Sequence, residues 1–190
     1  MSLVRRASWE KRHRDAAPGP PEPCLLELLP VIPPGLALDI AAGTGRNAIA
    51  LARAGFRVVA ADYSVAAMRT VGRLAALEHL PIFPLITDLE ESFPFRHAVF
   101  DLVVNISYLD RRLVPQLKRA LRIGGVLLFD TFTIAQLPLG HPHDPKFMLQ
   151  HDELRAILAD MEMLHYREGL TTYASGRQAW RATALARRIA

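Results

Sequence analysis

The sequence of 190 residues contains a single cysteine, Cys24, so the chain cannot form an internal disulfide, and we expect a reducing compartment, the cytoplasm. It lacks any apolar run of the roughly 18 residues that a membrane-spanning helix needs. The basic residues at its start are not followed by an apolar stretch, which argues against a secretory signal. It also lacks internal repeats and low-complexity tracts. With 51% hydrophobic and 22% charged residues, the composition is that of an ordinary globular protein.

The net charge of +4 comes from the two ends of the sequence. Residues 1–14 hold five basic residues and one acidic residue, and residues 177–190 hold four basic residues and no acidic one. The 14 basic and 18 acidic residues between these segments give the rest of the chain a negative charge. Basic ends are commonly solvated surface, so the charge does not indicate a nucleic-acid partner.

A Pro-rich stretch, "PGPPEP" at residues 18–23, is typical of a stiff connector. We therefore expect residues 1–23 to form an arm and connector and residues 24–190 to form one domain. Trp9 and His13 lie in the arm. Two interpretations are balanced: an arm that closes over a bound ligand, or an unstructured terminus with chance aromatic content.

Five apolar segments predict strands, at residues 36–41, 57–62, 82–88, 99–106 and 126–132. Helical patterns separate them, and Gly124 and Gly125 are expected to end the last of these helices. Pro84 predicts that the third strand lies at or near a sheet edge. A helix is expected around residues 152–160.

The last part of the chain differs from what precedes it. Two strand-like runs, "MLHYREGL" and "QAWRATALARR", predict an antiparallel hairpin. Strands this apolar, alternating with helices, indicate a parallel sheet covered on both faces. The sequence therefore predicts an α/β fold: a Rossmann-like, seven-stranded, mostly parallel sheet with helices on both faces and a C-terminal antiparallel hairpin.

The Gly-rich segment "GTGRNA" (residues 43–48) lies between the first predicted strand and its helix. Glycine lets the backbone approach a ligand, and the helix start offers free N–H groups. The segment matches the dinucleotide pattern G-x-G-x-x-A at Gly43, Gly45 and Ala48. Asp62 ends the second strand, where a carboxylate accepts two hydrogen bonds from a ribose diol. These features suit NAD and S-adenosylmethionine equally.

Three further features separate the two cofactors. Asp39 lies within the first strand, where it either orients the turn or meets a ligand ammonium group. Asp88 ends the third strand, in a position to accept a hydrogen bond from an adenine amino group. The C-terminal hairpin is uncommon in doubly wound nucleotide-binding folds.

The chain resembles the class I S-adenosylmethionine-dependent methyltransferases over roughly residues 24–190. Five motifs carry the resemblance in the order that the family uses: "LDIAAGTGRNAIALA", "VVAADYSVAAM", "ITDLEE", "FDLVVNISYLDRRL" and "LKRALRIGGVLLFDTFT". The "GTGRNA" form and the short length are most similar to the small bacterial branch of tellurite-resistance methyltransferases. One position departs from the pattern, since Ala41 stands where the family often has glycine.

The resemblance implies a role for each matching position. The backbone at Ala41, Gly43 and Gly45 lies against the methionine part of the cofactor. Further contacts follow in chain order: Asp62 with the ribose, Tyr63 beside the adenine, Asp88 and Leu89 with the adenine, and Asn105 near the methionine moiety. The alternative is that the two acids cap strand ends and that Asn105 satisfies a loop.

Candidate catalytic residues lie in the loops after the fourth and fifth strands. Tyr108 is expected to line the substrate pocket, and His141 and His143 are weaker candidates for a base. Arg111 and Arg112 are expected to attract an anionic substrate. The two histidines with Asp144 also suggest a metal site, but the absence of a third His or Cys nearby argues against one, and no metal is expected.

The resulting hypothesis is in-line methyl transfer from S-adenosylmethionine to a small-molecule acceptor. An NAD-dependent oxidoreductase is the first alternative, although no catalytic pair is evident after the fifth strand. An RNA or protein methyltransferase is the second, and it lacks the Asn-Pro-Pro-aromatic signature at "NISY". A binding module without catalysis is the third.

Overall fold

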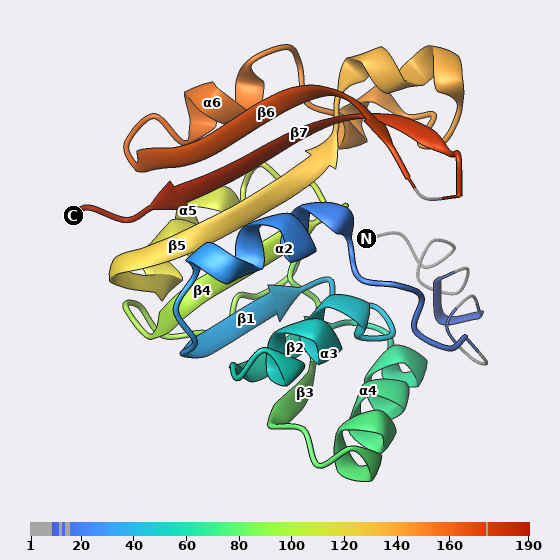
Figure 1. The fold of residues 1–190 in the computed structure, drawn as a ribbon, viewed down its shortest axis with the longest axis vertical. Coiled ribbons are helices and arrows are strands. Elements are labelled where there is room, and N and C mark those ends of the chain that lie inside the picture. Colours follow the sequence, from blue (N-terminus) through green and yellow to red (C-terminus); the bar gives the residue numbers. More distant parts are fainter. Residues whose placement is uncertain (1–8, 12, 14–15, 174) are drawn as a thin grey trace.

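The computed structural model describes residues 9–11, 13, 16–173 and 175–190. Seven strands form one sheet with the order β3-β2-β1-β4-β5-β7-β6 (Figure 1). The parallel strands are β1 (Leu36–Ile40), β2 (Arg57–Asp62), β3 (Ile82–Ile86), β4 (Phe100–Ile106) and β5 (Leu121–Phe132). The hairpin strands β6 (Glu162–Thr172) and β7 (Gln178–Arg187) are antiparallel, and β7 pairs with β5. The predicted fold class is confirmed.

Residues 16–173 and 175–190 contain the α-helices α2 (Pro23–Leu28), α3 (Arg46–Arg53), α4 (Val65–Leu77), α5 (Val114–Ala120) and α6 (Glu153–Ile157). Three 3-10 helices accompany them: η1 (Leu29–Val31), η2 (Ile134–Leu139) and η3 (Pro145–Phe147). Residues 9–11 and 13 are also helical. In the part of the chain that the structure describes, no helix is both long enough and apolar enough to cross a membrane.

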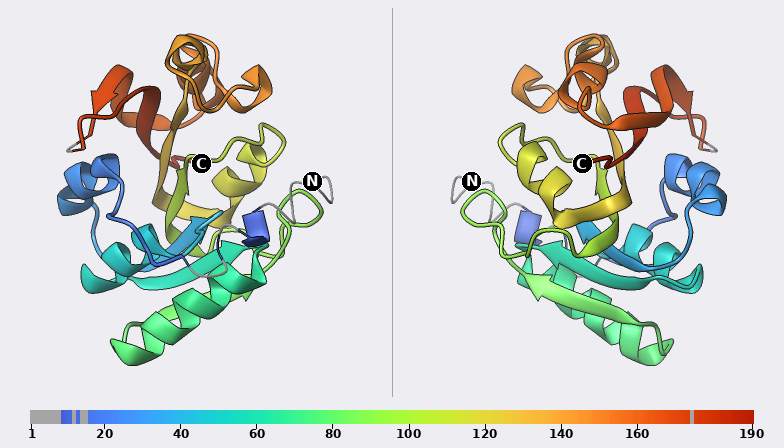
Figure 2. Two further views of the ribbon diagram at one scale, coloured as in Figure 1. Left: turned by 90° about the vertical axis from the view of Figure 1, so that its right-hand side faces the viewer. Right: turned by 90° about the vertical axis from the view of Figure 1, so that its left-hand side faces the viewer.

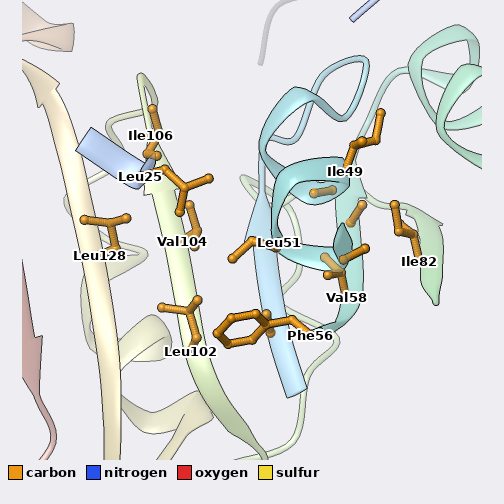
Figure 3. Close-up of a cluster of buried hydrophobic side chains, with 14 of the residues drawn as sticks. Leu25, Ile49, Leu51, Phe56, Val58, Ile82, Leu102, Val104, Ile106 and Leu128 are labelled. Atoms are coloured by element: carbon orange, nitrogen blue, oxygen red, sulfur yellow. The ribbon is translucent and has the colours of Figure 1, made fainter. Parts of the chain in front are cut away.

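The central strands β1, β4 and β5 are largely buried on both faces, as their apolar sequences predict, whereas the edge strands β3 and β6 are partly exposed. Helices α2 and α3 cover one face and α5 covers the other, as the two edge-on views in Figure 2 show. The core on the α2–α3 side includes the residues labelled in Figure 3, among them Leu25, Leu51, Phe56, Val104 and Leu128. The opposite core contains Phe129 and the apolar side of α5. This packing holds the carboxyl ends of β1, β2 and β4 in fixed positions.

Three expected boundaries differ from the structure, and the expected edge position of β3 is right. Strand β3 lies at the sheet edge, as Pro84 predicts, but it ends at Ile86, so Asp88 follows the strand. Gly124 and Gly125 do not end a helix, because α5 ends at Ala120 and β5 begins at Leu121. A Cβ on Gly125 would lie 2.9 Å from the carbonyl oxygen of Phe100, so this glycine allows two backbones to approach within the sheet. The helix expected around 152–160 is shorter, Glu153–Ile157.

The turn between β1 and α3 depends on Gly45. This residue precedes α3 with a φ of 87°, in the left-handed region that side chains other than glycine rarely adopt. A Cβ at this position would also lie 2.7 Å from Cγ2 of Val71 on α4. Gly45 is therefore required both for the backbone conformation and for the contact between two helices.

Replacement of Gly45 by alanine is expected to lower the free energy of unfolding by about 2 to 4 kcal/mol, because backbone strain and overpacking add. Urea denaturation measures the change. Gly19→Ala is the matched control: nothing lies within 4 Å of a Cβ there, and we expect a change within about 0.5 kcal/mol. Equal free energies of unfolding for the two variants would contradict the conclusion that the fold requires Gly45.

Candidate functional site

A cavity of about 480 Å³ opens at the carboxyl ends of the parallel strands. Its walls come from the Gly-rich turn after β1, the end of β2, and the segments that follow β3, β4 and β5. The hairpin and residues from the N-terminal arm complete it. A cavity of this size and position is typical of a small-molecule site in an open α/β sheet.

Asp62, at the end of β2, is held by two main-chain donors. Its Oδ2 accepts a hydrogen bond from the N–H of Gly43 at 2.9 Å, and its Oδ1 accepts one from the N–H of Ser64 at 2.8 Å. The residue is buried, yet it lines the cavity. Because each oxygen keeps a further lone pair, the carboxylate can still accept hydrogen bonds from a ligand.

Asp88 lines the same cavity as Asp62, together with Tyr63 and Leu89. It lies beyond the end of the neighbouring strand β3, and its Oδ1 accepts a hydrogen bond from the N–H of Glu90 at 2.9 Å. The structure therefore brings together the two acids whose proximity the sequence predicts. Their contacts with a cofactor stay a prediction.

Ala41 and Gly43 also line the cavity, whereas Gly45 and Asn105 do not. Asn105 is buried in β4, and its Nδ2 donates to the carbonyl oxygen of Tyr108 at 2.9 Å. In this structure its side chain therefore shapes the loop after β4, which is the structural alternative to a cofactor contact.

Asp39 is buried in β1 beneath the Gly-rich turn, at 1% exposure. Its Oδ2 has no hydrogen-bond partner among the residues that the structure describes. Burial raises the pKa of Asp39 from 3.8 to about 7, although the charge of Arg46 and the main chain of Ala48 oppose the shift. Asp39 does not line the cavity; its buried carboxyl group lies beneath the turn that forms part of the cavity wall.

Tyr108 and His141 line the cavity, and His143 does not. Burial, followed by the charge of Asp110, raises the pKa of the Tyr108 hydroxyl well above its ordinary value of 10.0, so this residue stays protonated at neutral pH. The rings of His141 and His143 pack edge to face, with centroids 5.7 Å apart. The side chain of Gln136 donates to the carbonyl oxygen of His141 at 3.1 Å and thereby holds this wall in place.

Arg111 and Arg112 do not line the cavity, so the structure gives no support to the expectation that they attract a substrate. Arg111 donates to Glu153 and to the carbonyl oxygens of Lys146 and Met148. Arg112 is exposed and pairs with Asp110. Both arginines stabilise loops.

Two other arginines, which the sequence reasoning missed, face the cavity from the hairpin. Arg181 is buried and forms an ion pair with Asp130, and its Nη2 donates to Oγ of Ser107 at 2.8 Å. Its guanidinium carbon lies 4.4 Å from the centre of the Phe132 ring. Arg177 lies on the cavity wall as well. The sequence does contain a signal for Arg181, because this arginine occupies an inward position within the apolar run "AWRATALA".

Two residues of the arm, Trp9 and His13, also line the cavity. Glu10, between them, accepts hydrogen bonds from Oγ of Ser64 at 2.6 Å and from the N–H of Ala66 at 3.0 Å. These contacts join the arm to the start of α4, beside Asp62. The described part of the arm therefore covers the side of the cavity that contains the Gly-rich turn.

The metal interpretation of His141, His143 and Asp144 has no counterpart in the structure. Among the described residues, the His and acidic side chains whose ligand atoms lie within 4.8 Å of one another are His151, Asp152 and Glu168. These residues do not line the cavity.

Comparison with known proteins gives a matching domain model for part of the chain and a fold. Residues 37–125 match a family model described as a methyltransferase domain. "Hemagglutinin 1" of Eikenella corrodens is 34% identical over 165 residues, which are 80% of this chain and 53% of that protein. The chain thus spans about half the length of this curated relative.

Two solved structures show the fold. TehB from Haemophilus influenzae superposes with a TM-score of 0.72 at 23% identity, over 86% of this chain and 61% of that chain. Geranyl diphosphate C-methyltransferase from Streptomyces coelicolor A3(2), solved with Mg²⁺, geranyl diphosphate and S-adenosyl-L-homocysteine, gives 0.70 at 14% identity over all of both chains. Residues 37–125 therefore match a methyltransferase-domain model, and the sheet has the fold of these two solved structures.

Replacement of Asp39 by asparagine is expected to change the pH dependence of stability. The folded protein holds a proton that the unfolded chain releases above about pH 4, so the native protein loses stability as pH rises from about 4 to about 7. The stability of Asp39→Asn relative to the native protein should therefore rise across this window, by roughly 1.4 kcal/mol per pH unit, and level off above it. Urea denaturation at pH 4, 5, 6, 7 and 8 measures the difference.

Asp160→Asn is the control for this experiment. Asp160 is exposed, and a hydrogen bond from Lys118 lowers its pKa below 3.8. Its replacement should produce no rise between pH 4 and 7. A pH-independent difference for Asp39→Asn would show that this carboxyl group titrates normally.

Proposed function

Because residues 37–125 match the methyltransferase-domain family and the sheet has the class I methyltransferase fold, we propose that this protein transfers a methyl group from S-adenosylmethionine to a small-molecule acceptor. One observation carries the proposal: Asp62 and Asp88, at the ends of neighbouring strands, line a single cavity that also contains the Gly-rich turn. An adenosine needs acceptors of this kind at its ribose and at its adenine amino group.

The residues present fit the cofactor. Asp62 accepts hydrogen bonds from the ribose hydroxyls, and Asp88, Leu89 and Tyr63 surround the adenine. The turn at Ala41 to Gly43 lies along the methionine part. The unpaired Oδ2 of Asp39 leaves a buried carboxyl group beneath that turn, and a cationic ligand bound there would favour its ionised form.

The sulfonium of the cofactor supplies the activated methyl group. The task of the protein is to hold the acceptor in line with that group and to exclude water, and such positioning can lower a barrier by roughly 7–11 kcal/mol in favourable cases. Trp9 and His13 lie where they exclude water from the turn. Where the acceptor carries a proton, His141 is the residue that takes it, because Tyr108 keeps its own proton at neutral pH.

The acceptor binds in the half of the cavity formed by the loop after β4, the loop after β5 and the hairpin. Tyr108, Phe132 and Phe147 give this half apolar walls, and Arg177 and Arg181 give it positive charge. No carboxylate is paired with Arg177 among the described residues. A small acceptor with a carboxylate, phosphate or oxyanion group fits this lining best.

Calorimetric titration with S-adenosylhomocysteine and with NAD tests the cofactor. We expect S-adenosylhomocysteine to bind and NAD to show no measurable binding. Asp62→Ala and Asp88→Ala should each weaken binding about 10-fold or more, since a hydrogen bond to a charged group contributes roughly 1.5–3 kcal/mol. Asp160→Asn, outside the cavity, is the control. Tight NAD binding would replace the proposal with the oxidoreductase alternative.

Methyl transfer from tritiated S-adenosylmethionine to matched pairs of compounds tests the acceptor. Each pair consists of an acid and its neutral amide or alcohol, and we expect transfer to the charged member. Arg177→Met should lower kcat/KM for that member about 10-fold or more. Arg69→Met, an exposed arginine on α4, should leave it unchanged. If methyl transfer to the neutral compounds is equally fast, the hairpin arginines do not bind a charged group of the acceptor.

A further inference from the structure

Ser107 is the first residue after β4, and none of the expectations above assigns it a function. It lines the cavity, and it is exposed although the strand before it is buried. Its φ is 60°, in the left-handed region that residues other than glycine rarely adopt. Such a conformation persists only where the surrounding contacts impose it, and residues of this kind cluster at functional sites. The contacts of Ser107 therefore need an explanation.

Two hydrogen bonds hold Ser107 in place. Its N–H donates to the carbonyl oxygen of Asp130 at 2.8 Å, and its Oγ accepts from Nη2 of Arg181 at 2.8 Å. Arg181 also binds the carboxylate of Asp130 through Nε at 2.6 Å. The backbone and the side chain of Ser107 are thus anchored to the same buried ion pair, which gives the hydroxyl a fixed position on the cavity wall.

The guanidinium of Arg181 makes the Ser107 hydroxyl a better donor. A hydroxyl has one donor hydrogen and two lone pairs, and Arg181 occupies one lone pair. Hydrogen-bonded groups polarise one another, so a cation that donates to Oγ strengthens the O–H as a donor. Among the described residues, none accepts a hydrogen bond from this hydroxyl. Arg181 itself is only 3% exposed, so it acts on a ligand mainly through Ser107.

The charges in this half of the cavity match a single negative charge. Arg181 and Asp130 neutralise each other. Arg177 is the second hairpin arginine on the wall, and no carboxylate is paired with it among the described residues. Two phenylalanine rings give the same half an apolar lining. One cation and one hydroxyl donor fit the two oxygens of a carboxylate, whereas a phosphate carries more charge than this wall balances.

We infer that Ser107 determines the specificity of the acceptor site for a carboxylate. Its hydroxyl donates to one carboxylate oxygen, Arg177 binds the other, and the hydrocarbon part of the acceptor lies against the apolar lining. Ser107 is a binding contact and takes no proton from the acceptor. The inference rests on the proposed function and names the substrate class of the same site: small monocarboxylic acids with an apolar body.

Benzoate and benzamide are the probes, each titrated into protein saturated with S-adenosylhomocysteine and followed by ligand-observed NMR. Benzamide has the same ring and a carbonyl group without the negative charge. We expect the native protein to bind benzoate about 10-fold more tightly than benzamide. Ser107→Ala should weaken benzoate binding about 10-fold and benzamide binding threefold or less, because a hydrogen bond to a charged group is roughly twice as strong as a neutral one.

Ser107→Gly separates the hydroxyl from the backbone, because glycine removes the hydroxyl and adopts a φ of 60° without strain. The glycine and alanine variants should lose the same benzoate affinity. Ser92→Ala, at an exposed serine outside the cavity, should change neither titration. S-adenosylhomocysteine should bind all three variants within twofold of the native affinity, and thermal denaturation of each variant reports folding.

The outcomes are distinct. Equal weakening of benzoate and benzamide in both Ser107 variants would make the residue structural and overturn the inference. Native benzoate affinity in the well-folded glycine variant would overturn it as well, as would a native protein that binds S-adenosylhomocysteine but not benzoate. These results leave the proposed cofactor intact. If the native protein does not bind S-adenosylhomocysteine, the proposed function fails, and the inference fails with it.

Discussion

The carboxylate of Asp62 connects three segments that would otherwise be positioned independently. Its hydrogen bond from Gly43 fixes the turn after β1 to the end of β2, and its hydrogen bond from Ser64 fixes the start of α4. Oγ of Ser64 in turn accepts from the N–H of Ala67 and donates to Glu10 of the arm. Strands β1 and β2 pair in parallel, with Asp39 opposite Ala60. The donor Gly43, which follows β1, and the acceptor Asp62, which ends β2, therefore lie at the same end of the two strands. One side chain thereby sets the shape of the cavity wall.

A second constraint lies on the opposite side of the cavity, where Arg181 and Asp130 are buried together. Burying two charges costs several kcal/mol for each ion, and the mutual attraction offsets this only with good geometry and further hydrogen bonds. Here Ser107 accepts from the arginine, and Thr183 donates to the aspartate at 2.6 Å. The pair bridges β5 and β7, so the antiparallel hairpin is attached to the parallel sheet at the point where it faces the cavity. An apolar pair would fill the same space without presenting a cation to the cavity.

The sequence predicts those features that local chemistry determines. Continuous apolar runs predict buried parallel strands, and Pro84 predicts the edge because proline has no N–H to donate to a neighbouring strand. Strand-end acids predict which side chains meet, since parallel strands end at the same side of the sheet. Gly124 and Gly125 were misassigned because a glycine pair that stops a helix also permits close backbone approach in a strand. The sequence does not predict where a long side chain points. The carboxylates that bind Arg111 and Arg181 lie 42 and 51 positions away in the chain, and no local pattern identifies them.

The order of the walls along the chain has a consequence for how such a protein diversifies. The turn, the two strand-end acids and their supporting strands all lie before residue 90, and the family model ends at residue 125. Most of the opposite wall, from Phe132 through the loop to the hairpin, comes from the remaining third of the chain. A recombination event or an engineered graft could exchange this contiguous C-terminal segment. The exchange would change the side chains on one wall of the cavity and leave the wall formed before residue 90 unchanged. Only the short segment after β4 would have to adapt to both.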